Sequence, residues 1–309
     1  PHALRISANT YEITTPIRIG IILKSPLPHI LNIIITASAT NAGTYNIVLK
    51  ITNTSNYQWN DKTTANKTVN WKINPKSVAV SWGTTTTFNY TGRVQAPTAN
   101  ASSGVTGETI NVTRTSAINA GSYTSTASIS SVTGGRARKE NYTLTGNTKA
   151  FTINKVAAGN PTLTAVTATY DGKAHYVTVS GGYGGTINYR TSTNNSSWGS
   201  WTTTKPSLTD VGTIYVQAYV AGDGNHNNTG TTGSVTLRMN PKSVAVTWGT
   251  TTFTYNGNAQ APTATATSGV NGETINVTRT TATNAGSYTS TASISSVSGG
   301  RANKSNYTL

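Results

Sequence analysis

Small or apolar residues alternate with polar ones along several stretches of the chain. After Gly121 one row of alternate positions reads Tyr123, Ser125, Ala127 and Ile129, and the other reads Thr124, Thr126 and Ser128. A second stretch has the same alternation, with an apolar row of Ile214, Val216, Ala218 and Val220. A period of two residues is typical of a strand with one buried face. We therefore predict that Tyr123, Ala127, Ile129 and the second apolar row are buried, and that Thr124, Tyr215 and Tyr219 face outward.

Helical spacing of apolar residues is not convincing in any window of 12 residues. Apolar residues make up 35% of the 309-residue chain and charged residues 10%, and much of the remainder is Thr, Ser, Asn and Gly. Such β-branched, turn-rich chemistry favours many short strands. We predict an all-β protein, with two-sheet sandwiches of immunoglobulin type.

Two stretches of sequence occur twice. NAGSYTSTASISSV stands at 119–132 and again at 284–297, and NPKSVAV stands at 74–80 and at 240–246. The long period is therefore about 165 residues, which is too long for one small repeat.

Two shorter markers divide this period. Tyr-x-Gly occurs at 90–92, 170–172 and 255–257, and Asn/Asp-x-Gly occurs at 41–43, 119–121 and 210–212. They predict four repeats: a B-like repeat (1–72), a first A repeat (73–155), a B repeat (156–239) and a second A repeat (240–309). The N-terminal part of the B-like repeat has a different composition, and we expect short linkers near Asn154-Lys155 and Asn240-Pro241.

The B repeat resembles a known family. Its run Ala168-Thr-Tyr-Asp-Gly-Lys-Ala174, a Gly-rich hairpin and then Thr209-Asp-Val-Gly-Thr213 look like the MBG/YDG-type bacterial immunoglobulin-like repeats. The resemblance extends over about 38–309. It implies tandem β-sandwich domains in a beads-on-a-string array, each contacting neighbouring repeats of the same chain, in a large extracellular protein of the bacterial cell surface.

The two A repeats differ at their ends. In the first A repeat, 145–154 alternates like a final strand, but the second A repeat stops at Leu309 before such a segment. The gap should leave unpaired backbone and an open apolar edge. We expect the natural chain to continue with a segment like 145–154; the alternative is a strand donated by another copy in a filament, through Ile17, Ile19, Ile21 and Leu23. Trp82 and Trp248, being equivalent, should share one environment.

Candidates for catalysis are few. The chain has 8 carboxylates, 4 His and no Cys. The two repeated carboxylates, Glu108 and Glu273, each lie in a Gly-Glu-Thr-Ile turn, and the His residues lack metal-ligand spacing. We predict that the protein is not an enzyme and that it needs no cofactor or metal.

Two sets of residues resemble special sites, and the alternative for each is an ordinary surface role. The stretch 223–227 has oxygen ligands at alternate positions, as calcium loops do, but Ser234 stands where a bidentate Glu is expected. Lys76, Asn147 and Glu108 have the chemistry of an intramolecular isopeptide bond. We favour a hairpin tip for the first and solvated side chains for the second.

Aromatic residues give the best indication of a ligand. The candidate binding residues in the B repeat are Tyr189, Arg190, Trp198, Trp201, Tyr215 and Tyr219. Exposed flat rings beside Arg can stack on sugars or contact a protein. The alternative is that these rings fill the core or stabilise cross-strand neighbours.

The net charge is +15, with the basic residues spread along the chain. Specific nucleic-acid binding requires a denser basic stripe, so we expect instead diffuse attraction to acidic cell-wall polymers or glycans. Lys24, Pro26, Pro28 and His29 interrupt the Ile-rich stretch 17–35, which argues against a membrane span. The sequence thus favours an extracellular stalk or the body of a filament of self-associating copies, with an adhesin as the alternative.

Overall fold

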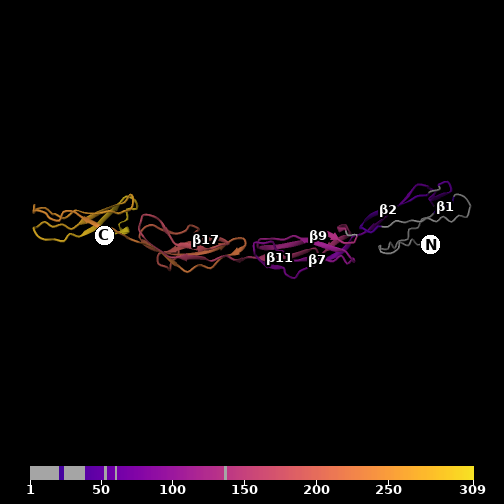
Figure 1. The fold of residues 1–309 in the computed structure, drawn as a ribbon, viewed down its shortest axis with the longest axis horizontal. Helices are drawn as coiled ribbons and strands as arrows, with labels where there is room; N and C mark the ends of the chain where they lie inside the picture. The colour runs from indigo at the N-terminus through magenta and orange to yellow at the C-terminus, as the bar shows by residue number, and fades with distance from the viewer. Residues whose placement is uncertain (1–20, 24–38, 52–53, 60, 136–137) are drawn as a thin grey trace. The chain divides into compact units, whose positions relative to one another are not determined.

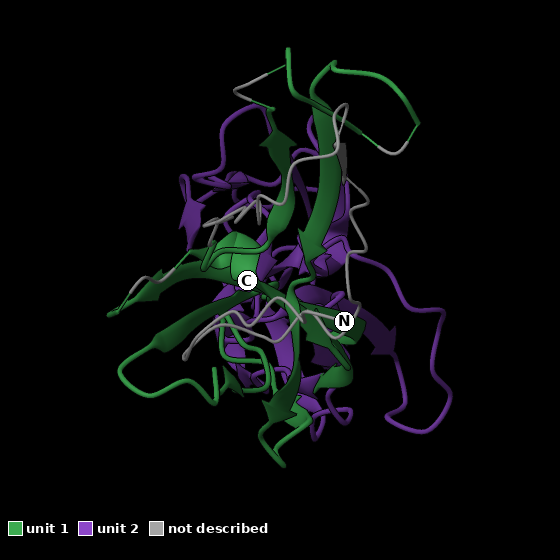
Figure 2. Cartoon of the chain, turned by 90° about the vertical axis from the view of Figure 1, so that its right-hand side faces the viewer, with its two compact units in different colours: residues 1–154 green, residues 155–309 purple. Residues whose placement is uncertain are grey.

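The chain forms two compact units, which we call the N-terminal half (1–154) and the C-terminal half (155–309) (Figure 2). The computed structural model describes residues 21–23, 39–51, 54–59, 61–135 and 138–309. In these ranges the protein is almost entirely β, which confirms the predicted all-β class. The only helical turns there are two short 3-10 segments, η1 (Lys139–Asn141) and η2 (Lys304–Asn306).

The B-like repeat contains two antiparallel strand pairs. They are β1 (Ile21–Leu23) with β3 (Tyr57–Trp59), and β2 (Gly43–Leu49) with β4 (Lys67–Ile73). Leu49, Ile51 and Trp59 form its buried cluster. Most of the Ile-rich stretch lies outside the described residues, including Ile17 and Ile19 of the candidate donor strand, but Ile21–Leu23 pairs within its own repeat.

The first A repeat has two sheets (Figure 1). A three-stranded sheet has the order β10-β5-β7, and a four-stranded sheet has the order β6-β11-β9-β8. Val78, Ile110 and Tyr142 are buried together, and they come from strands of both sheets. The strands are β5 (Lys76–Trp82), β6 (Thr87–Asn89), β7 (Ala99–Ala101), β8 (Thr109–Arg114), β9 (Gly121–Thr133), β10 (Tyr142–Thr145) and β11 (Thr148–Asn154).

The B repeat is built around a four-stranded sheet of order β14-β21-β19-β17, with three two-stranded pairs beside it. Val177, Tyr189, Val216, Ala218 and Leu237 form its buried cluster. The strands are β12 (Val156–Ala157), β13 (Pro161–Thr164), β14 (Val166–Thr169), β15 (His175–Tyr176), β16 (Thr178–Gly181), β17 (Gly185–Ser192), β18 (Ser207–Leu208), β19 (Gly212–Gly222), β20 (His226–Asn227) and β21 (Val235–Asn240).

The predicted faces of β9 and β19 are those of the structure. Val216, Ala218 and Val220 of β19 are fully buried, and Ala127 of β9 is almost so. Tyr123, Ile129 and Ile214, predicted to be buried, are partly exposed. Thr124 is exposed, whereas Tyr215 and Tyr219 on the outward row are half-buried. The period of two residues therefore predicted the correct register, because a shift by one residue would exchange the two rows.

The second A repeat keeps part of the architecture of the first. Its β25 and β26 pair with the same register shift as β8 and β9, between Asn276 and Val277 in one and between Asn111 and Val112 in the other. The strands are β22 (Lys242–Ser243), β23 (Val246–Trp248), β24 (Ala264–Ala266), β25 (Thr274–Arg279), β26 (Ala292–Ser298) and β27 (Tyr307–Thr308).

The prediction of one environment for the two equivalent tryptophans is wrong. Trp82 is half-buried and its indole Nε1 donates to the Gly146 carbonyl at 2.8 Å. Trp248 is exposed. The physical reason is that Gly146 belongs to the segment before β11, which has no counterpart in 240–309.

Candidate joint and aromatic site

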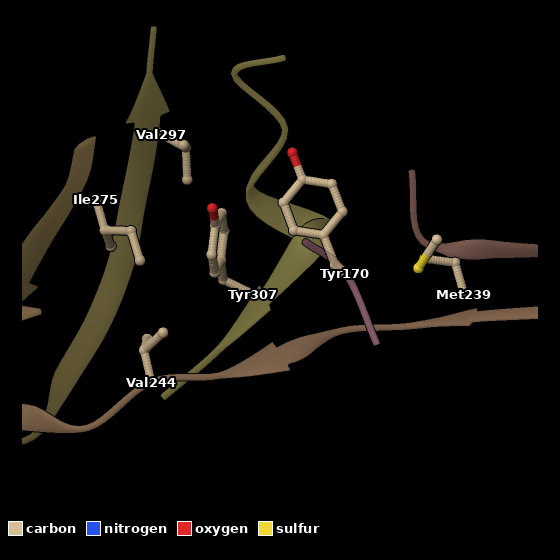
Figure 3. Packing of buried hydrophobic residues seen from close by; sticks show 6 residues of the cluster. All are labelled: Tyr170, Met239, Val244, Ile275, Val297 and Tyr307. Atoms are coloured by element: carbon tan, nitrogen blue, oxygen red, sulfur yellow. The ribbon is translucent and has the colours of Figure 1, made fainter. Parts of the chain in front are cut away.

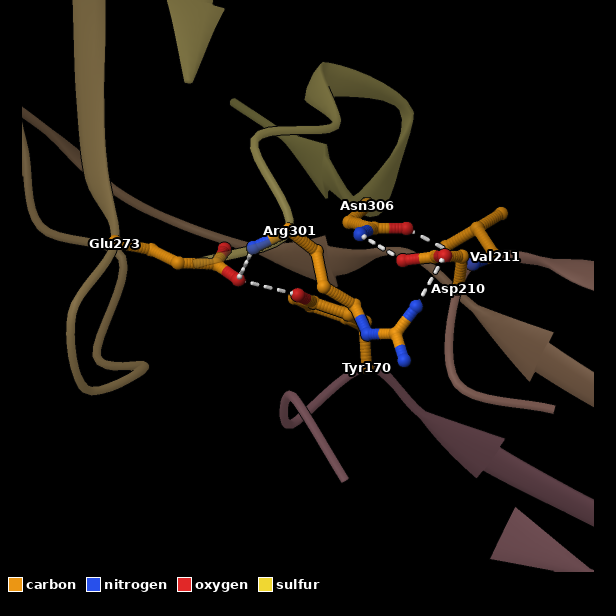
Figure 4. Close-up of polar contacts among 6 residues, drawn as sticks. All are labelled: Tyr170, Asp210, Val211, Glu273, Arg301 and Asn306. Atoms are coloured by element: carbon orange, nitrogen blue, oxygen red, sulfur yellow. Dashed lines mark hydrogen bonds and ion pairs between the residues drawn. The ribbon is translucent and has the colours of Figure 1, made fainter. Parts of the chain in front are cut away.

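The Tyr-x-Gly marker of the B repeat contacts the second A repeat. Tyr170 follows β14, and its hydroxyl donates to Glu273 Oε1 at 2.6 Å (Figure 4). The Tyr307 hydroxyl donates to Glu273 Oε2 at 2.7 Å, so one carboxylate joins both tyrosines. The two rings meet edge to face, with 5.4 Å between their centroids.

Burial and the hydrogen bonds among Tyr170, Tyr307 and Glu273 shift the pKa of all three side chains. Burial and then the hydrogen bond to Glu273 raise the pKa of Tyr170 to about 12, and the same two causes raise the pKa of Tyr307. Burial alone would raise the pKa of Glu273, but hydrogen bonds from Tyr170, Tyr307 and the Arg301 backbone N–H lower it overall. The carboxylate is therefore charged at neutral pH, and both phenols are protonated donors.

The Asp-x-Gly marker of the B repeat contacts the same neighbour. The Val211 backbone N–H donates to Asn306 Oδ1 at 2.9 Å, and Asn306 Nδ2 donates to Asp210 Oδ1 at 2.9 Å. Arg301 Nη1 donates to Asp210 Oδ2 at 3.0 Å. Figure 4 shows the Asn306 carboxamide facing Asp210 and Val211, with a dashed line to each. Because Asn306 is completely buried, both of its bonds are shielded from water.

An apolar cluster lies beside these polar contacts. Figure 3 shows Tyr170 of the B repeat next to Tyr307 and Met239 on the other side of Tyr170, and the cluster also contains Val244, Ile275 and Val297. Gly172 has φ +78°, and a Cβ placed on it would lie 2.8 Å from Val270 Cγ1. We call this whole set of polar and apolar contacts the C-terminal joint. It connects the B repeat to the second A repeat across Pro241.

The N-terminal half contains the same polar contact. The Ala42 backbone N–H donates to Asn141 Oδ1 at 2.7 Å, and Asn141 Nδ2 donates to Asn41 Oδ1 at 3.1 Å. Tyr142 donates to Glu108 Oε2 at 2.6 Å, as Tyr307 does to Glu273. The sequence analysis used the markers only to divide the chain into repeats and missed this role. The signal was present in Asn-Tyr-Thr-Leu, which occurs at 141–144 and 306–309.

Four of the six predicted binding residues lie together on the B repeat. The Arg190 guanidinium carbon is 5.1 Å from the Trp198 ring centroid and 4.6 Å from the Trp201 ring centroid. Trp201 meets Tyr219 edge to face at 4.7 Å. Arg190 Nε and Nη2 both donate to Gln217 Oε1, at 2.9 and 2.7 Å, which fixes the guanidinium against the sheet. We call Arg190, Trp198, Trp201 and Tyr219 the aromatic cluster.

The other two predicted residues lie elsewhere. Tyr189 is buried in the core of the B repeat, and burial raises its pKa. Tyr215 is on the outward row of β19 opposite Ser192, with Gln217 between it and Tyr219 on that row. Tyr189 and Arg190 are adjacent on β17, and adjacent residues of a strand point to opposite faces of the sheet. Tyr189 therefore lies on the inner face, while Arg190 lies on the outer face.

The two special sites have ordinary partners in the structure. Lys76 Nζ donates to the Gly104 carbonyl at 3.2 Å, while Glu108 accepts from Tyr142, so no Lys76–Asn147 pair forms beside a carboxylate. Asp223 Oδ1 bonds the Asn225 backbone N–H at 2.7 Å and His226 Nδ1 at 2.8 Å. In the described residues, no group of three or more His, Asp or Glu side chains is placed to hold a metal ion.

No protein-family model and no curated protein matches this sequence. Among the helical segments of the described ranges, none has the length and apolar character needed to cross a membrane. The joint and the aromatic cluster are therefore the features of the molecule that bear on its function.

Proposed function

We propose that this chain is a non-enzymatic extracellular spacer, the repeat stalk of a bacterial surface protein or the body of an extracellular filament, built from tandem immunoglobulin-like sandwiches. The observation that carries the proposal is the polar contact that occurs twice. In each half, one Asn of the A repeat accepts from the backbone of the marker before it and donates to the marker's Asn or Asp side chain. Repeated joints, rather than a repeated catalytic group, suit a protein whose length grows by duplication.

The joint has the properties of a stiff connection. A hydrogen bond contributes about 1 kcal/mol net, but breaking one whose partners stay buried costs about 1–3 kcal/mol. Bending the C-terminal joint would expose Asn306, Tyr170 and Tyr307, which are all buried. The cost of such bending holds each B repeat and the A repeat after it in one orientation.

A distance measurement between spin labels tests this stiffness. Because the chain has no Cys, two introduced Cys residues are unique labelling sites. Thr186→Cys on β17 with Thr265→Cys on β24 spans the C-terminal joint, and both positions are exposed. We expect a narrow distance distribution that broadens with Asn306→Ala.

A second label pair serves as the control. Thr167→Cys with Thr186→Cys lies wholly within the B repeat, and its distribution should not respond to Asn306→Ala. A broad distribution across the unaltered joint would contradict the spacer proposal, since a flexible connection holds nothing at a fixed distance.

Location and charge belong to the same proposal. A diffuse charge of +15 attracts acidic cell-wall polymers or glycans without a defined site. Antibodies against the chain should label intact, unpermeabilised cells of the source organism. Labelling that requires permeabilised cells contradicts an extracellular stalk.

The aromatic cluster supports an adhesin as the second candidate function. Two indole rings and a fixed guanidinium form a surface that can stack on sugar rings or on a protein. Binding of the full chain to a glycan array, lost in Trp201→Ala, supports this function. Trp248→Ala is the matched control, because Trp248 is exposed outside the B repeat. Equal loss in both variants, or no binding at all, contradicts it.

A further inference from the structure

Arg190 carries a positive charge that forms no ion pair within the described residues. Its guanidinium lies close to the Trp198 and Trp201 rings, and the side chain is half-buried. The carboxylates of the B repeat bond other partners: Asp171 bonds His175, Asp210 bonds Arg301, and Asp223 bonds His226. A charge that is partly removed from water and has no counter-ion favours the binding of an anion.

Gln217 determines which edge of the guanidinium is available. A guanidinium has five N–H groups, and Gln217 Oε1 accepts one from Nε and one from Nη2 of Arg190. These bonds occupy the edge between Nε and Nη2, while no described residue accepts a hydrogen bond from Nη1. The edge between Nη1 and Nη2 therefore keeps two parallel donors, which is the arrangement that binds both oxygens of a carboxylate.

A glutamate at position 217 would be the stronger partner for an arginine with a purely structural role. It would accept the same two hydrogen bonds and would also neutralise the charge, whereas glutamine leaves the charge in place. In the first A repeat, Thr126 and Ser128 take the places of Gln217 and Tyr219. The first A repeat therefore lacks both the acceptor that orients the guanidinium and the ring beside it.

The aromatic rings around Arg190 restrict the form of the anion. Trp198, Trp201 and Tyr219 are half-buried, so part of each side chain is accessible. The face of an aromatic ring is electron-rich, which repels an anion but attracts the weakly positive C–H bonds of a sugar ring. A ligand that suits both the rings and the charge has a carboxylate attached directly to a flat C–H face. A hexuronic acid has this structure, whereas an acidic peptide carries its carboxylate on a flexible side chain.

We propose that the aromatic cluster binds a carboxylate-bearing sugar, a hexuronic acid residue of an acidic glycan. The edge between Nη1 and Nη2 of Arg190 donates to the carboxylate, and an indole ring packs against the C–H face of the sugar. This inference rests on the adhesin candidate of the proposed function and names its ligand class. It differs from the diffuse attraction exerted by the net charge, because a bidentate pair depends on the position of one guanidinium.

A glycan array tests the proposal with the full chain. The array carries oligosaccharides of galacturonic, glucuronic and mannuronic acid, and each is also present as its methyl ester, which keeps the sugar rings and removes the charge. At about 0.15 M salt, attraction between exposed charges is screened beyond about 8 Å. We expect at least one acid to bind about tenfold or more tightly than its own ester.

Two variants test the role of the guanidinium. Gln217→Glu should remove the preference for the acid, because the new carboxylate neutralises Arg190 from within the protein. Arg190→Lys should weaken the preference, because an ammonium lacks the planar pair of donors. Thermal unfolding should show that Gln217→Glu is at least as stable as the parent, so that its lost preference is not a loss of fold.

Arg238→Gln is the matched control. Arg238 is exposed on β21 of the same repeat, and its replacement changes the net charge by the same amount as Gln217→Glu. We expect Arg238→Gln to leave the preference for the acid unchanged. An equal reduction in both variants would assign the preference to net charge and would overturn the proposal.

The remaining outcomes separate this inference from the adhesin function. Equal binding of acids and esters overturns the inference but leaves a sugar-binding adhesin. Binding of sulfated neutral oligosaccharides or of a poly-aspartate peptide in place of the uronic acids also overturns it, because the anion then belongs to another class. If no sugar binds at all, the inference and the sugar-binding adhesin are both wrong.

Discussion

A single carboxamide connects two repeats in each half of the chain. Asn306 uses its oxygen for the Val211 N–H and its nitrogen for Asp210, and Asn141 uses its own in the same way. Only a carboxamide provides an acceptor and a donor on adjacent atoms, so neither Asp nor Ser reproduces both bonds. This requirement explains why Asn stands at the equivalent position of both A repeats.

Gly172 provides the sharpest test at the scale of one residue. Gly172→Ala should destabilise the C-terminal half by about 1 kcal/mol, because alanine disfavours the left-handed backbone conformation. The overlap of the new Cβ with Val270 should cost about 1–3 kcal/mol more. Gly257 is the matched control. Its φ is +76°, but a Cβ there meets nothing within 4 Å, so Gly257→Ala should cost only the first amount.

Chemical denaturation measures both variants. Adding Gly172→Ala to a Val270→Ala protein should lower the free energy of unfolding less than adding it to the parent does. The remaining loss should be close to that of Gly257→Ala. Equal losses in the two glycine variants would show that Val270 does not press on this turn.

At the scale of the element, sequence predicted what depends on neighbouring residues along one strand. The rows of β9 and β19 followed from their alternation. The environments of Trp82 and Trp248 did not follow, because their difference depends on Gly146, which is 64 residues from Trp82. The joint was missed for the same reason. Tyr170 and Glu273 are 103 residues apart, and nothing in either local pattern indicates the other.

The turn that carries Glu273 predicts a dependence of stability on pH. The folded protein lowers the pKa of Glu273 from 4.5, so the charged form stabilises the fold. That contribution is complete above the ordinary pKa, declines as the pH falls through 4.5 toward the lowered pKa, and is absent below both. We expect the free energy of unfolding of the C-terminal half to fall over this acid range.

Glu273→Gln separates this effect from general acid unfolding. The variant should be less stable than the parent at neutral pH, and the difference should shrink as the pH falls below 4.5. Glu140→Gln removes a negative charge from an exposed site and serves as the control. If the parent and Glu273→Gln lose stability in parallel, the carboxylate is not what holds the two tyrosines.

At the scale of the whole molecule, the chain divides into its two halves between Asn154 and Lys155. Each of the four apolar clusters found in the described residues lies within one half. Two belong to the N-terminal half and two to the C-terminal half. Leu208 packs against both clusters of the C-terminal half, so we expect that half to unfold as one cooperative unit, separately from the N-terminal half.

Calorimetry of the full chain should therefore show two unfolding transitions, and Gly172→Ala should lower only one of them. For a unit of this size the expected shift is about 2–4 °C for each kcal/mol lost. A single transition that moves as a whole in Gly172→Ala would mean that the halves unfold together, and that stability is shared along the entire chain.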